Sequence, residues 1–206
     1  MDKSSRKGSR RLSWLLRHGA PNVGLAMDPA GWVDIDDVLT YLNISRPHLE
    51  MIVRTNDKQR FQLSRDRVRA CQGHSVSNPA ITYEALEASW QEYRGEQTIW
   101  HGTTMASVAQ IGREGLLPLT RTHVHCSESP DSPVGRRNSA EVMLGLAPNR
   151  ILHANLSIFI APNGVILVRR VPRDAILELR PITRKAKKAA PALRASLGLE
   201  PTGRQD

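Results

Sequence analysis

The chain has 206 residues, 40% hydrophobic but only 4% aromatic, so aliphatic side chains must fill the core of one large domain or two small ones. Its formal net charge of +9 favours a polyanionic partner, because Lys and Arg release counterions when they bind phosphates. No apolar run is long enough to span a membrane and no signal peptide is recognisable, so we expect a cytoplasmic protein. Cys71 and Cys126 lack the spacing of metal ligands, and we expect no metal.

The first predicted element is a helix. Leucines within residues 12–16 repeat at helical spacing, Ser9 is a candidate N-cap, and Gly19 followed by a proline ends the pattern. Arg17 and His18 therefore fall in the last turn of this helix, where the helix dipole favours cations.

Two further helices and a β-hairpin follow. Asp34 and Ser45 are candidate N-caps for helices at 35–42 and 46–53, and strands are predicted on either side of a polar turn within 60–70. Three helices followed by a hairpin is the order of a winged helix, a module that often binds nucleic acid. Many domains with no such activity share this order.

The second half is predicted to be rich in β-structure. A linker at 79–98 carries Tyr83, Leu86, Trp90 and Tyr93 at a spacing that fits one amphipathic helix. Beyond it, the patterns predict strands at 99–101, 122–126, 152–160, 165–170 and 175–179, a helix at 107–113, and a hairpin turn at Asn163-Gly164. After Pro181 the chain is basic, which indicates a helix or a disordered tail.

Two clusters in the first half could handle phosphate. Arg17-His18 places a planar cation beside a titratable ring, although a surface pair that serves the helix dipole would look the same. Arg60 opens the first hairpin strand and could reach a phosphate or belong to a solvated turn. The polar run from Arg69 to Ser75 surrounds Gly73 and is either a binding loop or an ordinary one.

A third cluster lies in the second half. His101-Gly102-Thr103 ends a strand, and its glycine would let a ligand approach the backbone. Alternation from Arg121 to Ser127 places Arg121, His123 and His125 on one face, but no convincing third metal ligand follows. The sequence has no Walker loop, no dinucleotide-binding glycine fingerprint and no paired catalytic carboxylates.

The order of these motifs resembles the RNA 2′-phosphotransferase family, in particular its KptA-like bacterial branch. The resemblance covers residues 9 to about 180. It is carried by Leu15-Leu16-Arg17-His18, Gly31-Trp32-Val33, Asn56-Asp57-Lys58-Gln59-Arg60-Phe61, Gln72-Gly73-His74-Ser75, His101-Gly102-Thr103, the run from Arg121 to Ser127, and Gly135-Arg136-Arg137.

The resemblance implies an α+β fold with two lobes. Residues 1–78 would form a winged-helix-like RNA-binding lobe, 79–98 a linker, 99–184 an NAD-binding lobe of the ADP-ribosyltransferase fold, and 185–206 a basic tail. Arg121 would then reach the site from the second lobe.

The resemblance also implies a reaction with NAD⁺ as co-substrate. An internal RNA 2′-phosphate would attack the nicotinamide ribose and expel nicotinamide, giving a 2′-phospho-ADP-ribosylated RNA intermediate. The ribose 2″-hydroxyl would then attack the phosphate, giving 2′-OH RNA and ADP-ribose 1″,2″-cyclic phosphate. Such RNA processing serves tRNA splicing in some organisms, and the physiological RNA of this chain stays open.

The family's site residues are carried over position by position. The catalytic set falls on Arg17, His18, Arg60 and Arg121. NAD contacts are implied for His101, Gly102, Thr103, His125, Ser127 and Arg137, and RNA contacts are expected of Arg69, Gln72 and His74.

Two other functions remain open at this stage. The same phosphate site would serve an ADP-ribosyltransferase that modifies terminal phosphates of nucleic acids. A non-enzymatic winged-helix nucleic-acid-binding protein would need neither His101 nor Arg121. In each case we expect a monomer that does not associate with membranes.

Overall fold

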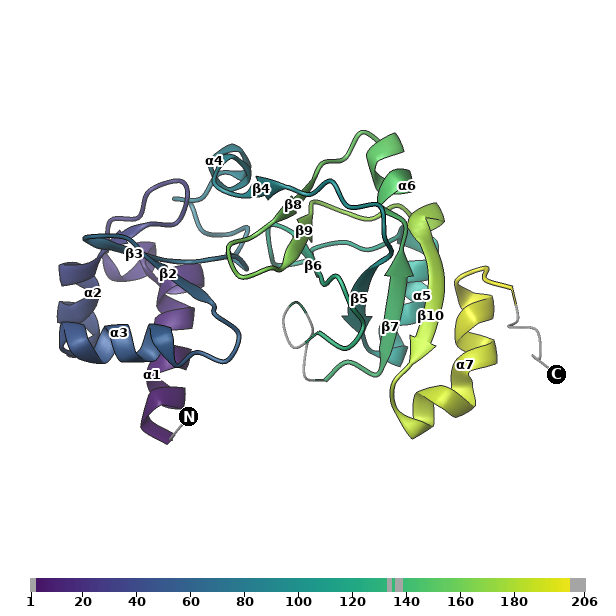
Figure 1. Cartoon of the computed structure of the whole chain (residues 1–206), viewed down its shortest axis with the longest axis horizontal. Helices are drawn as coiled ribbons and strands as arrows, with labels where there is room; N and C mark the ends of the chain where they lie inside the picture. Colours follow the sequence, from purple (N-terminus) through teal and green to yellow (C-terminus); the bar gives the residue numbers. More distant parts are fainter. Residues whose placement is uncertain (1–2, 133–134, 136–138, 201–206) are drawn as a thin grey trace. The chain divides into compact units, whose positions relative to one another are not determined.

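The computed structural model describes residues 3–132, 135 and 139–200 (Figure 1). It mixes helices and sheets, as the predicted α+β class requires. The chain divides into two compact units. The first comprises Met1–Gln91, Leu119–Thr122 and Ala161–Asn163, and the second comprises Glu92–Pro118, His123–Ile160 and Gly164–Asp206.

The first unit begins with helix α1 (Lys3–Trp14), which continues as a short π-helix, η1 (Leu15–Gly19), and a 3-10 turn, η2 (Pro21–Val23). Arg17 and His18 lie in η1, as predicted for the end of the helix. The prediction that Ser9 is an N-cap is wrong. Ser9 lies inside α1, and its buried hydroxyl accepts a hydrogen bond from Asn56 instead.

Helices α2 (Ile35–Leu42) and α3 (Arg46–Arg54) follow as predicted. Asp34 caps α2 by accepting a hydrogen bond from the Asp36 amide, whereas Ser45 stands at the N-cap of α3 without a side-chain bond. The predicted hairpin is also confirmed. Strands β2 (Phe61–Leu63) and β3 (Arg67–Ala70) pair antiparallel, and β1 (Val33–Asp34) adds to β3.

The predicted helix of the linker is shorter than the apolar spacing indicated. Helix α4 (Tyr83–Ala88) ends where Ser89 donates its hydroxyl to the Leu86 carbonyl, and a short strand, β4 (Gln91–Glu92), follows. Trp90 lies outside the helix because its indole N–H donates to the Cys71 carbonyl, 3.0 Å away. The Tyr93 amide bonds to the Ile158 carbonyl, so Tyr93 also leaves the helical path.

The second unit is built on antiparallel sheets (Figure 1). One sheet has the order β10-β7-β5, and the other has the order β4-β8-β9-β6. Their strands are β5 (Ile99–Thr103), β6 (Val124–Cys126), β7 (Val142–Leu146), β8 (Ile158–Ile160), β9 (Ile166–Val168) and β10 (Ile176–Pro181). The helices are α5 (Met105–Glu114), α6 (Pro148–His153), the 3-10 turn η3 (Arg173–Ala175) and α7 (Arg184–Ser196).

Strand β7 is the central strand that the sequence patterns missed. All five of its residues are buried, so it shows no alternation of polar and apolar side chains. The strand predicted at 152–160 is too long, because α6 occupies residues up to His153. The predicted strand at 122–126 begins only at Val124, since the Thr122 amide bonds to His74 in the first unit.

The predicted hairpin turn at Asn163-Gly164 is confirmed. Strands β8 and β9 pair antiparallel on either side of it, and Gly164 has a φ of 77°, which glycine adopts without steric cost. The basic segment after Pro181 is helical through Ser196. No helix within the described part of the chain is both long and apolar enough to cross a membrane.

Helix α5 packs so closely on the end of α7 that Gly112 has no room for a side chain. A Cβ there would overlap the Ser196 carbonyl group. Gly→Ala usually stabilises a helix by about 1 kcal/mol, but we expect Gly112→Ala to lower the free energy of unfolding by about 1–3 kcal/mol. Denaturant unfolding would measure this change. Gly8→Ala is the control, because its Cβ would meet side-chain atoms of Ile52 and His48 rather than backbone. A more stable Gly112→Ala protein would contradict the packing.

Candidate functional site

A five-residue segment of backbone, residues 71–75, contacts the backbone at all three arginines of the predicted catalytic set. The Cys71 amide donates to the Arg60 carbonyl (2.8 Å), and the Ser75 amide donates to the Arg17 carbonyl (3.1 Å). Ser75 also forms an antiparallel bridge with Arg121. The segment Leu119–Thr122 belongs to the first unit, so Arg121 lies in the same unit as the other three residues. The sequence had placed Arg121 in the second lobe.

Arg17 is strongly affected by its surroundings. Burial lowers its pKa to about 10, with further lowering from the charges of Arg121 and Arg60, while Cys71 acts in the opposite direction. The Arg17 Nε atom is buried and finds no hydrogen-bond acceptor among the described residues. Gathering like charges around a buried donor is unfavourable unless an anion offsets it, so the arrangement is that of an anion site.

His18 lies beside this cluster and responds to it. Its pKa is lowered from 6.5, first by burial and then by the charges of Arg17 and Arg121. The ring is therefore neutral at pH 7, where an imidazole can either donate or accept a proton.

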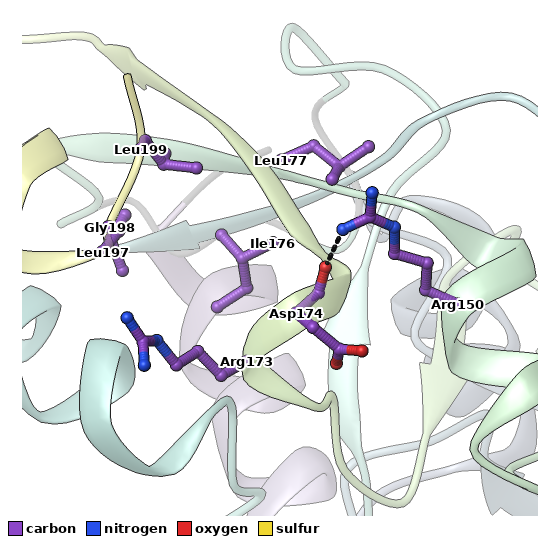
Figure 2. Close-up of a pocket in the computed structure, with 8 residues that line it drawn as sticks. All are labelled: Arg150, Arg173, Asp174, Ile176, Leu177, Leu197, Gly198 and Leu199. Atoms are coloured by element: carbon purple, nitrogen blue, oxygen red, sulfur yellow. Dashed lines mark hydrogen bonds between the residues drawn. The ribbon is translucent and has the colours of Figure 1, made fainter. Parts of the chain in front are cut away.

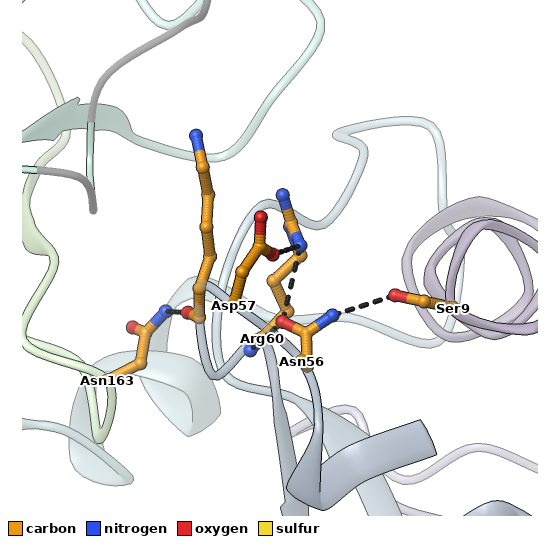
Figure 3. Close-up of polar contacts among 6 residues, drawn as sticks. Ser9, Asn56, Asp57, Arg60 and Asn163 are labelled. Carbon is orange, nitrogen blue, oxygen red and sulfur yellow. Dashed lines mark hydrogen bonds and ion pairs between the residues drawn. The ribbon is translucent and has the colours of Figure 1, made fainter. Parts of the chain in front are cut away.

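Arg60 is held by a hydrogen-bond network centred on Asn56 (Figure 3). The Asn56 Oδ1 atom accepts from the Arg60 amide (3.0 Å) and from Arg60 Nη1 (3.2 Å), while Asn56 Nδ2 donates to Ser9 Oγ (2.7 Å). Asp57 adds an ion pair to Arg60 Nη1 at 3.0 Å. Sequence reasoning missed the role of Asn56 in positioning Arg60, although an amide four residues before an arginine can form such a turn.

The residues expected to contact RNA are all buried. Arg69 donates to Gln62 Oε1 (2.9 Å) and to Ser89 Oγ (2.7 Å), and its guanidinium stacks on the Trp32 ring at 4.7 Å. These contacts favour a structural role for Arg69. His74 is fully buried, and its carbonyl accepts from the Thr122 amide, which fixes the segment that carries Arg121. Gln72, which lies between Arg69 and His74 in the sequence, is also buried.

The predicted NAD contacts lie on two strands of the second unit. His101, Gly102 and Thr103 end β5, and His101 Nδ1 lies 2.8 Å from the His125 carbonyl of β6. This contact fixes the orientation of the His101 ring. Ser127 is buried, pairs with Trp100 in a β-bridge, and donates its hydroxyl to the Ser129 carbonyl (2.8 Å).

One predicted contact, Arg137, lies outside the described residues. Among the residues that are described, no group of three or more His, Cys, Asp or Glu side chains could hold a metal ion.

The second unit also has a pocket that contains none of the predicted site residues (Figure 2). Two residues that line the pocket are joined by a hydrogen bond, which Arg150 Nη1 donates to the Asp174 carbonyl (2.6 Å). The pocket is lined by Arg150, Arg173, Asp174, Ile176, Leu177, Leu197, Gly198 and Leu199. The arginines of the pocket are exposed, unlike the half-buried Arg17.

Residues 3–170 match the model of the family described as "RNA 2'-phosphotransferase, Tpt1 / KptA family". The chain belongs to this RNA 2′-phosphotransferase family. The match includes all four residues of the predicted catalytic set and ends before α7.

Relatives in this family cover most of the chain. A protein of Pseudomonas savastanoi pv. phaseolicola is 35% identical over 84% of this chain and 93% of its own length. A protein of Burkholderia lata is 38% identical over 83% of this chain and 89% of its own length. A protein of Rhodopirellula baltica is 34% identical over 83% of this chain and 94% of its own length. All three carry the name "Probable RNA 2'-phosphotransferase".

Asn56 is buried and supports Arg60 through two hydrogen bonds. Asn56→Ala would remove both hydrogen bonds to Arg60 and leave buried polar groups unpaired, so we expect the free energy of unfolding to fall by about 1–3 kcal/mol. Asp57→Ala is the control, because it removes only a solvent-exposed ion pair, worth about 0–1 kcal/mol. Equal losses in denaturant unfolding would show that Asn56 is not the support.

The cluster also predicts how His18 titrates. Because the folded-state pKa lies below the unfolded one, protonation favours the unfolded state, and the free energy of unfolding falls as the pH drops below about 6.5. We expect Arg121→Gln to raise the pKa of His18 in an NMR titration, since one repelling charge is removed. Arg60→Gln is the matched control, because Arg60 is not among the groups that lower this pKa. An unchanged His18 pKa in Arg121→Gln would place Arg121 away from the cluster.

Proposed function

We propose that this protein is an NAD⁺-dependent RNA 2′-phosphotransferase that moves an internal RNA 2′-phosphate to NAD⁺. The observation that carries the proposal is the cluster of Arg17, Arg60 and Arg121 around the buried, unpaired Nε of Arg17. A phosphate in transfer spreads negative charge over several oxygens, and guanidinium groups stabilise that charge at every stage. Family membership supports the same substrate class.

We assign the first unit to RNA. Helices α1 to α3 are followed by the β2–β3 hairpin, which is the order of a winged helix. The cluster of Arg17, Arg60 and Arg121 belongs to the same unit. In this assignment Arg17, Arg60 and Arg121 bind the 2′-phosphate. Gln72 and His74 stay proposed RNA contacts, and Arg69 supports the fold through its contacts with Ser89 and Trp32.

We assign the second unit, as an ADP-ribosyltransferase-like lobe, to NAD⁺. Its candidate residues offer imidazole, hydroxyl and backbone amide groups, which suit the amide and ribose hydroxyls of a nicotinamide riboside. His101 is fixed by its contact with the His125 carbonyl, and Thr103 is buried at the same strand end. Gly102, Ser127 and Arg137 complete the proposed NAD set. NAD⁺ supplies the ribose that receives the phosphate.

The protein's own groups act mainly on the second step. That step forms a bond from the ribose 2″-oxygen to phosphorus, breaks the bond to the RNA 2′-oxygen, and moves one proton from the first oxygen to the second. His18, neutral at pH 7, can accept the first proton or donate the last. The arginines stabilise the charge that builds on the phosphate.

The test compares two substrates with NAD⁺ present. With an oligonucleotide bearing an internal 2′-phosphate, we expect mass spectrometry to detect nicotinamide, the 2′-OH RNA and ADP-ribose 1″,2″-cyclic phosphate. Arg60→Ala and Arg121→Ala should slow the second step more than the first, so that ADP-ribosylated RNA accumulates.

The other outcomes identify the rival functions. ADP-ribosylation of a 5′-phosphorylated oligonucleotide, with no cyclic phosphate from the 2′-phosphorylated one, would indicate an ADP-ribosyltransferase of terminal phosphates. RNA binding without nicotinamide release would indicate a binding protein. Equal losses of both steps in Arg60→Ala and Arg121→Ala would show that these arginines only hold RNA.

A further inference from the structure

The first turn of α7 carries a concentrated positive charge that the proposed reaction does not use. Four of its first five residues are basic, and all four are exposed. No ion pair between described residues involves any of them, and the helix has no acidic residue in its first turn. We call this set the α7 basic cluster: Arg184, Lys185, Lys187 and Lys188.

The α7 basic cluster is placed where cations weaken a helix. The N-terminus of a helix carries partial positive charge, so cations in the first turn are repelled by it. Arg184 lies three and four residues from Lys187 and Lys188, a spacing at which like charges repel on the helix surface. Thr183 caps the helix by accepting a hydrogen bond from the Ala186 amide (3.1 Å), but no acidic side chain in the first turn offsets the four cations. Helix stability does not account for this concentration of positive charge, and its exposure leaves it open to a polyanion.

The opposite side of α7 is already used by the fold. Ala186 is fully buried, Leu193 and Leu197 pack with the core of the second unit, and Arg194 donates to the Leu179 carbonyl of β10 (2.8 Å). Figure 1 shows α7 beside β10. Because the apolar side is covered, α7 offers no hydrophobic face to insert into a membrane. A soluble polyanion fits the exposed side better than a lipid surface does.

The α7 basic cluster also lies beyond the family match. That match ends at residue 170, and α7 begins at Arg184. The residues that carry the proposed chemistry all lie before residue 170. The cluster therefore lies outside the part of the chain that matches the family model.

We propose that the α7 basic cluster binds the phosphate backbone of the RNA substrate, at nucleotides other than the one whose 2′-phosphate is transferred. This inference rests on the proposed function. Contacts of this kind carry no base sequence information and add affinity that falls with salt. The enzyme would therefore prefer long RNA to short 2′-phosphorylated oligonucleotides.

The experiment uses the full chain with Arg184, Lys185, Lys187 and Lys188 all changed to Gln. For a tRNA carrying one internal 2′-phosphate, we expect the KM to rise at least tenfold with kcat unchanged, while kinetics with a 2′-phosphorylated trinucleotide stay as in the unaltered protein. In binding measurements without NAD⁺, the slope of log Kd against log salt should become shallower by about 3, since each lost single-strand contact contributes about 0.7.

A matched control removes the same charge elsewhere on the second unit. In this control, four exposed arginines outside α7 are changed to Gln: Arg94, Arg113, Arg170 and Arg173. The proposal is overturned if both variants raise the KM for the tRNA equally, or if the α7 variant leaves the KM and the salt slope unchanged. It is also overturned if the α7 variant loses binding to phosphatidylserine vesicles while its RNA binding is unchanged. Inactivity of the unaltered protein on the trinucleotide would defeat the proposed function instead, and RNA binding would still test the cluster.

Discussion

The structure depends on holding three guanidinium groups near one another although they repel. The backbone of residues 71–75 achieves this, because one of its amides bonds to Arg60, another bonds to Arg17, and Ser75 also bridges to Arg121. Burial is the main cause of the lowered pKa of Arg17, and the repulsion from Arg121 and Arg60 lowers it further. Cations that the backbone holds in place in this way are preorganised, which lowers the cost of binding an anion.

The supports of this site are buried polar groups rather than apolar packing. Asn56 joins Arg60 to Ser9 on α1, and Arg69 is enclosed by Gln62, Ser89 and Trp32. Gln59, directly before Arg60, adopts a left-handed φ of 45°, a conformation that costs about 1–3 kcal/mol. Its carbonyl accepts a bond from the Cys71 thiol. The strained backbone directly before Arg60 lowers the stability of the fold, and strain of this kind is typical of functional positions.

The second unit positions its candidate residues in a different way. Its central strand β7 is flanked by β5 and β10, and its fully apolar sequence anchors the strand on which His101, Gly102 and Thr103 stand. The cross-strand contact of His101 with the His125 carbonyl then fixes one ring. Here the sheet, rather than a polar network, positions the candidate residues, since neighbouring strands hold one another in register through their backbone bonds.

The sequence by itself determined the elements with strong local signals. Asp34 marked the start of α2, Asn163-Gly164 marked the hairpin of β8 and β9, and the ordered motifs marked the family. It did not reveal β7, whose continuous burial removes the alternation by which strands are recognised. Only the tertiary structure decided that Asn56 supports Arg60 and that Arg121 belongs to the first unit. The bonds from Asn56 to Arg60 are local, but Asn56 is held by Ser9, and the Arg121 segment is held by the bond from Thr122 to His74. These two partners lie far apart in the chain, so no local pattern encodes them.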